Sequence, residues 1–108
     1  MTERTSTDLV FAALADPTRR DLLRMVLAKG PLSTAELADG RPMSRQAVAK
    51  HLTTLTDAGL LKVIRHGRET SYDSTKRGMN PAAKWLRDAE KVQEKRQERL
   101  DKAAAKKR

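Results

Sequence analysis

The 108-residue sequence contains no cysteine and only three aromatic residues, Phe11, Tyr72 and Trp85. The lack of cysteine excludes disulfide bonds, thiolate metal sites and thiol redox switches. With so few aromatic side chains, Leu, Val and Ala must fill the core, and a second subunit would help to bury enough apolar surface. The length fits one domain with a single modest core.

Long apolar runs are also missing, since no segment approaches the roughly 18 to 20 residues that a membrane-spanning helix needs. The N-terminal sequence MTERTSTD is polar and of mixed charge, unlike a signal peptide. We therefore expect a cytoplasmic protein that has no membrane partner.

The formal net charge of +9 is distributed unevenly along the chain. Residues 41–70 hold six basic and two acidic residues, residues 84–108 hold ten and five, and the remainder sums to zero. Such a balance suits a polyanionic partner, but it equally suits a protein that is merely soluble. Charge alone therefore does not decide the function.

Residues 44–59, SRQAVAKHLTTLTDAG, predict a helix with two different faces, capped by Ser44 and followed by Gly59. An apolar stripe at steps of four, three and three residues consists of Val48, Leu52, Leu55 and Ala58. The opposite face has no acidic residue before Asp57 and consists of Arg45, Gln46, Ala49, Lys50, Thr53 and Thr54.

A shorter helix is predicted just upstream, where Ser33 and Glu36 have the spacing of a capping box. Residues 40–43 (GRPM) join it to the longer helix. A short helix, a tight turn and a longer basic helix describe a helix-turn-helix, whose second helix enters the DNA major groove. An ordinary helical hairpin fits these residues about equally well, so the rest of the chain must decide.

At the N-terminus we expect disorder over residues 1–7, then a short apolar helix that is capped by Thr7 or Asp8. Asp16 followed by Pro17 predicts a second helix, with an N-cap and then proline at the first helical position. Its buried side should hold Leu22, Leu23, Val26 and Leu27. Its outward side should hold Arg19, Arg20, Asp21 and Arg24.

After Gly59 the pattern predicts a β-hairpin, with strands over residues 60–66 and 69–74 and a tight turn over residues 66–68. Directly behind a helix-turn-helix, such a hairpin is a wing whose tip reaches the DNA backbone or minor groove. A solvated hairpin with incidental charge is disfavoured, because basic side chains gather near the tip at Arg65, His66 and Arg68.

Asn80 and Pro81 predict the start of a last helix, and residues 93–108 form a basic, partly helical tail. An apolar stripe on this helix can pack within one subunit or form a dimer contact with the first helix, and we favour the dimer. The predicted interface consists of Leu9, Val10, Phe11, Leu14, Trp85, Leu86, Ala89 and Val92. The fold class is thus mainly α with a small β-hairpin: a winged helix-turn-helix domain over residues 8–92, with about five helices and a two-stranded wing.

Five segments in this order resemble the ArsR-like family of bacterial winged-helix repressors, particularly members that lack metal ligands. They are ALADPTRRDLL (13–23), AEL (35–37), MSRQAVAKHLTTLTDAGLL (43–61), HGRETSY (66–72) and WL (85–86). The resemblance implies a homodimer that binds operator DNA, with the 44–58 helix in the major groove and the 60–74 wing beside it. It implies DNA contacts from Ser44, Arg45, Gln46, Lys50, His51, Arg65, Gly67 and Arg68; Thr54, on the same helix face, completes the predicted set.

Two departures from the family pattern matter. Many members have serine before the Lys-His pair, where this chain has Ala49, so one hydroxyl contact is missing and an operator sequence cannot be transferred. Metal-sensing members place cysteines before the turn or acidic and histidine ligands on the last helix. Here residues 33–40 read STAELADG, and the last helix has no histidine.

Metal and catalytic chemistry are not expected. His51 and His66 are the only histidines, which is too few ligands for a metal site. No GxSxG turn, phosphate-binding glycine loop or paired-carboxylate pattern occurs. We expect no cofactor and no enzymatic activity.

The leading hypothesis is a sequence-specific, DNA-binding transcriptional regulator, a homodimeric repressor that binds a palindromic operator. A second is a winged-helix module for protein-protein contact. Arg45 and Gln46 favour the first, because they suit guanine and adenine edges and a protein interface would carry more aromatic anchors. A metal or redox sensor is disfavoured by the missing ligands, and the sequence names no effector ligand.

Overall fold

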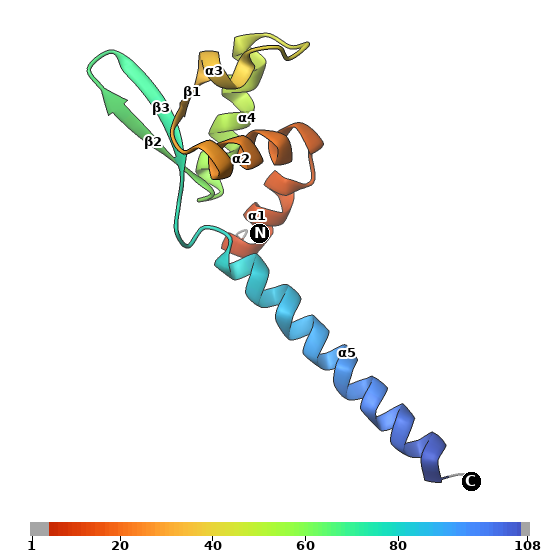
Figure 1. Cartoon of the computed structure of the whole chain (residues 1–108). Helices are drawn as coiled ribbons and strands as arrows, with labels where there is room; N and C mark the ends of the chain where they lie inside the picture. Colours follow the sequence, from red (N-terminus) through yellow and green to blue (C-terminus); the bar gives the residue numbers. More distant parts are fainter. Residues whose placement is uncertain (1–4, 107–108) are drawn as a thin grey trace, which may run out of the picture.

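The computed structural model describes residues 5–106 and shows a mainly α fold with a small antiparallel sheet. In Figure 1, helices α1 to α4 form one body, from which the β2–β3 hairpin and α5 project in different directions. The predicted mainly α fold with a β-hairpin wing is confirmed. In chain order the elements are α1 (Ser6–Leu14), α2 (Pro17–Lys29), β1 (Leu32–Ser33), α3 (Thr34–Ala38), α4 (Arg45–Asp57), β2 (Leu61–His66), β3 (Glu69–Ser74) and α5 (Asn80–Lys106).

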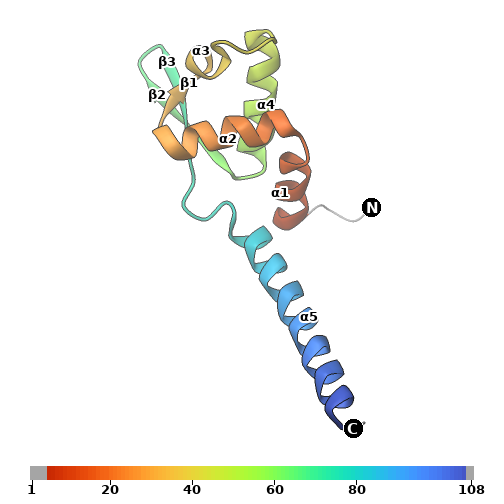
Figure 2. The same cartoon turned by 45° about the vertical axis from the view of Figure 1, so that its right-hand side comes forward.

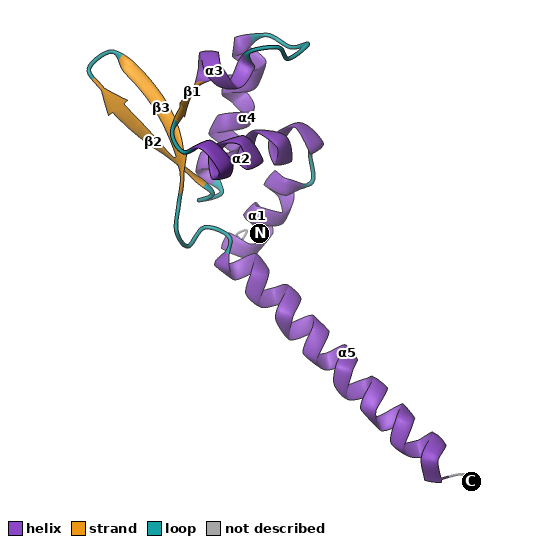
Figure 3. Ribbon diagram, in the orientation of Figure 1, coloured by secondary structure: helices purple, strands orange, loops and turns teal. Residues whose placement is uncertain are grey.

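The sheet has a third strand that the sequence did not predict (Figure 3). The two-residue β1 pairs with β3, with Leu32 opposite Tyr72, so the strand order is β1-β3-β2. Two residues are too short to show an alternating pattern, and β1 forms because Leu32 is buried beside β3. The segment directly before α3 is thus paired with the middle of β3.

The core lies between α1, α2, α3, α4 and the start of β2, and the predicted inner stripe of α4 is confirmed. Leu27, which was predicted to be buried, is 45% exposed, so that prediction is wrong. The buried side of α2 is centred on Leu22 and Val26, and Leu27 falls on its edge. The buried residues are Val10, Ala13, Leu22, Leu23, Val26, Leu32, Leu37, Val48, Leu52, Leu55, Ala58, Leu60, Leu61 and Ala82.

The predicted N-caps of α2, α3 and α4 are confirmed by hydrogen bonds from the first turn of each helix. Asp16 Oδ1 accepts from the backbone of Arg19 at 3.1 Å, and Ser44 Oγ accepts from that of Ala47 at 3.1 Å. Ser33 and Glu36 form the predicted reciprocal capping box.

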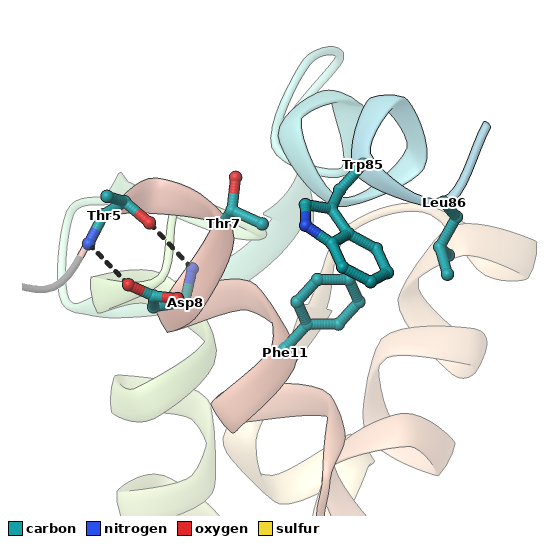
Figure 4. Close-up of a pocket in the computed structure, with 6 residues that line it drawn as sticks. All are labelled: Thr5, Thr7, Asp8, Phe11, Trp85 and Leu86. Atoms are coloured by element: carbon teal, nitrogen blue, oxygen red, sulfur yellow. Dashed lines mark hydrogen bonds between the residues drawn. The ribbon is translucent and has the colours of Figure 1, made fainter. Parts of the chain in front are cut away.

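The first helix begins earlier than predicted, because Thr5 and Asp8 form a further capping box (Figure 4). The prediction of disorder is therefore wrong for Thr5 to Thr7, while residues 1–4 lie outside the described residues.

Helix α5 runs for 27 residues and leaves the body as one continuous helix (Figure 2). Asn80 is its first residue, since the carbonyl oxygen of the preceding Met79 accepts a 2.9 Å hydrogen bond from the backbone N–H of Ala83. Residues 93–106 contain neither glycine nor proline and consist mainly of strong helix formers, so the helix continues to Lys106. Within α5 only Ala82 is buried.

Candidate nucleic-acid interface

The outer face of α4 presents polar and basic side chains with little competing charge. Gln46, Lys50 and Thr53 follow one another at steps of four and three residues, and all three are exposed. Arg45 is exposed at the start of the helix. The first turn of α4 holds no acidic residue, so the positive end of the helix dipole is not neutralised there.

The wing ends in a tight turn where the sequence predicted one, but the turn has two residues because His66 belongs to β2. His66 pairs with Glu69 across the hairpin, which leaves Gly67 and Arg68 at the tip. Gly67 has φ +59, a left-handed conformation that tight hairpin turns require and that glycine adopts without strain. Arg65, His66 and Arg68 are exposed, so two arginines and a histidine lie close together at the tip of the wing.

Helix α4 and the wing together line a groove of about 250 Å³. The predicted residue Arg65 lies in it, and so do Thr53 and Tyr72, which the predicted set did not include. No periodic pattern in the sequence connects positions on two β-strands with positions on α4, so this groove could not be predicted from the sequence. Its lining residues are Thr53, Thr56, Asp57, Val63, Arg65, Thr70 and Tyr72.

Two residues of the predicted set lie on a different side of α4. Thr54 faces a second groove, of about 440 Å³, which it lines together with Leu9 and Ala12 of α1. The Nδ1 atom of His51 lies 3.3 Å from Nη1 of Arg19 on α2. Thr54 and His51 therefore lie toward α1 and α2, whereas Thr53 lies toward the wing.

Arg19 was predicted to face outward, and this prediction is wrong. Its side chain is 19% exposed and donates to two carbonyl oxygens at the end of α1, those of Ala13 at 2.6 Å and Ala12 at 3.1 Å. The Ala12 carbonyl also accepts from the backbone N–H of the C-cap residue Ala15. Helix α1 has no basic residue in its last turn, so an arginine from α2 interacts with the negative end of the helix dipole there.

The backbone N–H of Arg19 donates to Asp16 and lowers the pKa of that carboxyl below its ordinary value. A backbone hydrogen bond from Thr18 and the charge of Arg19 lower it further by smaller amounts. Asp16 therefore stays ionised beside the Arg19 guanidinium at neutral pH.

A second exposed surface lies where α1 meets α5. The rings of Phe11 and Trp85 contact edge to face, with centroids 5.8 Å apart and an interplanar angle of 83° (Figure 4). They line a pocket of about 680 Å³ with Leu86. Trp85 is 57% exposed even after this contact, and Val92 on the same helix is 69% exposed. We call the exposed residues Phe11, Trp85, Leu86, Ala89 and Val92 the α1–α5 face.

Three residues of the predicted dimer interface are not fully available on this face. Val10 is completely buried in the core of its own subunit, so its assignment to an interface is wrong. Leu9 and Leu14 are half-buried and pack against the same core. In a helix of nine residues that contacts α2, α4 and α5, several apolar side chains must point inward.

Within residues 5–106, His, Asp and Glu side chains form no group of three or more that would hold a metal ion. Over the same range, no helix combines the length and the apolar character that crossing a bilayer requires.

Comparison with known proteins identifies the fold and the family. Residues 14–64 match a helix-turn-helix domain family. The chain is 48% identical over 56 residues to the HTH-type transcriptional regulator Rv2034 of Mycobacterium tuberculosis, which covers 52% of this chain and 51% of that protein. The chain thus spans about half the length of this curated relative.

Two solved structures cover most of the chain. An ArsR-like transcriptional regulator from Rhodococcus sp. RHA1 has a TM-score of 0.77 and 34% sequence identity, over 92% of each chain. A homodimeric winged helix-turn-helix DNA-binding domain from Mycobacterium bovis has a TM-score of 0.63 and 21% identity, over 83% of this chain and 91% of that chain. The second shares the fold, and the first also shares the sequence pattern. The chain belongs to the ArsR-like family of winged helix-turn-helix transcriptional regulators.

Proposed function

We propose that the protein is a sequence-specific DNA-binding transcriptional regulator that acts as a homodimeric repressor. The observation that carries this proposal is the exposed, acid-free leading face of α4, which lies next to a wing with Arg65, His66 and Arg68 near its tip. An α-helix of this kind fits the major groove, and a basic hairpin tip fits the adjacent phosphate backbone or minor groove.

Within this proposal the residues divide by role. Gln46 and Arg45 lie in the first turn of α4, where side chains reach base edges, and Lys50 follows one turn later. Arg65, Gly67 and Arg68 contact the backbone or the minor groove from the wing. Ser44 caps the helix at its DNA-facing end, and His51 and Thr54 lie on the flank toward α2 and α1.

We further propose that two subunits join through the α1–α5 face. Large apolar side chains that remain half exposed in one subunit favour burial against a second copy. The Mycobacterium bovis domain of the same fold is homodimeric. Two recognition helices in a symmetric dimer read half-sites about 10 base pairs apart, so the operator should be an imperfect palindrome. Such a regulator acts on chromosomal DNA, and we assign it to the cytoplasm.

Selection of bound DNA from random duplexes tests the proposal. We expect enrichment of an imperfect palindrome, and a single half-site should bind more weakly than the whole. If no sequence is enriched and binding follows only the charge of the competitor DNA, the proposal is wrong. A winged helix that binds an acidic protein partner would give this result, although exposed aromatic anchors are missing from α4 and from the hairpin tip.

A further inference from the structure

Arg19 of α2 connects two elements that the proposed function uses separately, α1 and α4. It lies in the first turn of α2, its Nε and Nη2 atoms bind the last carbonyls of α1, and its Nη1 atom contacts His51 of α4. The same helix α1 carries Phe11 of the α1–α5 face. One largely buried guanidinium thus links the proposed dimer contact with the proposed recognition helix.

The chemistry of this contact fixes the protonation of the imidazole. A guanidinium has only N–H donors and no acceptor. At 3.3 Å from Nη1, the Nδ1 atom of His51 must therefore accept, so it carries no proton and the neutral ring holds its proton on Nε2. His51 then presents an N–H donor at its other ring nitrogen, and phosphate oxygens are acceptors for such a donor.

Resting on the proposed function, we propose that Arg19 is a positioning residue for DNA binding. It holds His51 in the Nε2–H form with this donor directed away from α2, and it fixes α4 relative to the end of α1. Arg19 lies outside the helix-turn-helix and does not itself contact DNA in this proposal. Its effect on DNA binding passes through His51.

Arg20 provides a matched control because it shares one of the two roles of Arg19. Its Nη1 atom donates to the carbonyl oxygen of Leu14 at 2.7 Å, so it also binds the end of α1. Its side chain makes no hydrogen bond to α4 among the described residues. Loss of Arg20 therefore shows the structural cost of removing an α1 contact while the contact between Arg19 and His51 is kept.

The first experiment measures the tautomer of His51 in the full chain without DNA, from the ¹⁵N chemical shifts of its imidazole. We expect an unprotonated Nδ1 and a protonated Nε2 in the wild type and in Arg20→Met, and a mixture of tautomers in Arg19→Met. If His51 shows the same tautomer mixture in all three proteins, the proposal is overturned.

The second experiment is a double-mutant cycle on affinity for the selected operator, with Arg19→Met, His51→Ala and the double variant. Arg19→Met should weaken binding roughly tenfold in the wild-type background and by less than about twofold when His51 is already Ala. Arg20→Met should stay within about twofold of the wild type. Arg19→Lys keeps the charge but carries its donors on a single nitrogen, which cannot reach the three separate acceptors that the guanidinium binds, so it should show the same coupling even where Arg19→Met lowers stability.

If the wild type binds its operator but the effects of Arg19→Met and His51→Ala on affinity are additive, the role of Arg19 is overturned while the proposed function stands. A wild type that selects no DNA sequence would overturn the proposed function, and the role of Arg19 in DNA binding with it. The tautomer measurement needs no DNA, so it still shows in that case whether Arg19 controls His51.

Discussion

The hydroxyl of Thr75 donates a 2.6 Å hydrogen bond to the carbonyl oxygen of Gly59, the second residue after α4. The backbone N–H of Gly78 in turn donates to the Thr75 hydroxyl at 3.1 Å. The segment between β3 and α5 is thereby fastened to the end of α4. Together with the backbone hydrogen bond from Thr75 to Leu60 and the contact between α1 and α5, these two hydrogen bonds connect the long helix to the rest of the domain.

Gly78→Ala should destabilise the protein, because a Cβ at this position would overlap the carbonyl oxygen of Gly59 and the hydroxyl of Thr75. We expect a loss of about 1–3 kcal/mol in the free energy of unfolding, as for other overpacked sites. Urea denaturation measures it. Thr75→Ser keeps the hydroxyl and serves as the control, whereas Thr75→Val should cost about 1 kcal/mol. Equal stability of all three variants and the wild type would show that this connection does not hold the fold.

Arg68→Ala and Gln46→Ala should weaken DNA binding in different ways, since phosphate contacts set affinity and base contacts set specificity. Loss of Arg68 at the wing tip should weaken binding to all sequences alike and lower the salt slope by about 1. Loss of Gln46 should leave the slope nearly unchanged, cost on the order of 1–3 kcal/mol on the best operator and relax preference at one position per half-site. Salt titrations and single-base operator variants measure both. Equal weakening on every operator variant would remove Gln46 from base recognition.

Leu86→Lys should dissociate the proposed dimer without unfolding the subunit. Leu86 is 50% exposed on the α1–α5 face, so a charge there costs little in the monomer but would be buried in the dimer. Leu27→Lys is the matched control, because Leu27 is 45% exposed on α2, outside that face. Sedimentation measures the mass of each variant, and titration with the selected operator measures its affinity for DNA. If Leu27→Lys dissociates the protein and Leu86→Lys does not, the interface lies elsewhere.

Stability should fall on acidification through two helix caps. Backbone hydrogen bonds from Arg19 to Asp16 and from Ser33 to Glu36 lower the pKa of each carboxyl in the folded state. The unfolded chain therefore binds protons first as the pH falls, so this stabilisation is present above the unfolded pKa values of about 4 and is lost through the folded values.

The double variant Asp16→Asn and Glu36→Gln keeps side chains that can cap but do not titrate. Its melting temperature should depend less on pH below about 5 than that of the wild type. Melting curves across that range measure the difference. Parallel pH profiles for the two proteins would show that these caps do not contribute to acid sensitivity.

DNA binding should not respond to zinc or to chelators. Cysteine is absent from the sequence, and the described residues hold no cluster of three or more potential ligands. Titration of zinc, then of chelator, into the protein-operator complex checks this expectation. A reversible, stoichiometric change in affinity would contradict it and would point to ligands shared between subunits.

The local structure follows from short stretches of the sequence. Side chains at Asp16, Ser33 and Ser44 bind backbone N–H groups only three residues away, so the starts of α2, α3 and α4 follow from short-range chemistry. The inner stripe of α4 follows from its 3.6-residue period, and the wing turn follows from Gly67 between two strand-forming segments. These features carry the family resemblance and most of the predicted DNA-binding residues.

Contacts between elements far apart in the sequence could not be predicted, because they depend on how the helices and strands pack. Arg19 looked like a solvated helix residue, but the end of α1 folds back to it and His51 approaches from 32 residues away. Val10 and Leu27 were equally apolar in the sequence, yet packing buries the first and exposes the second. Strand β1 exists only because β3 lies beside it. Periodicity describes which side of one helix is apolar, whereas the neighbour that each side meets is set by how the helices pack.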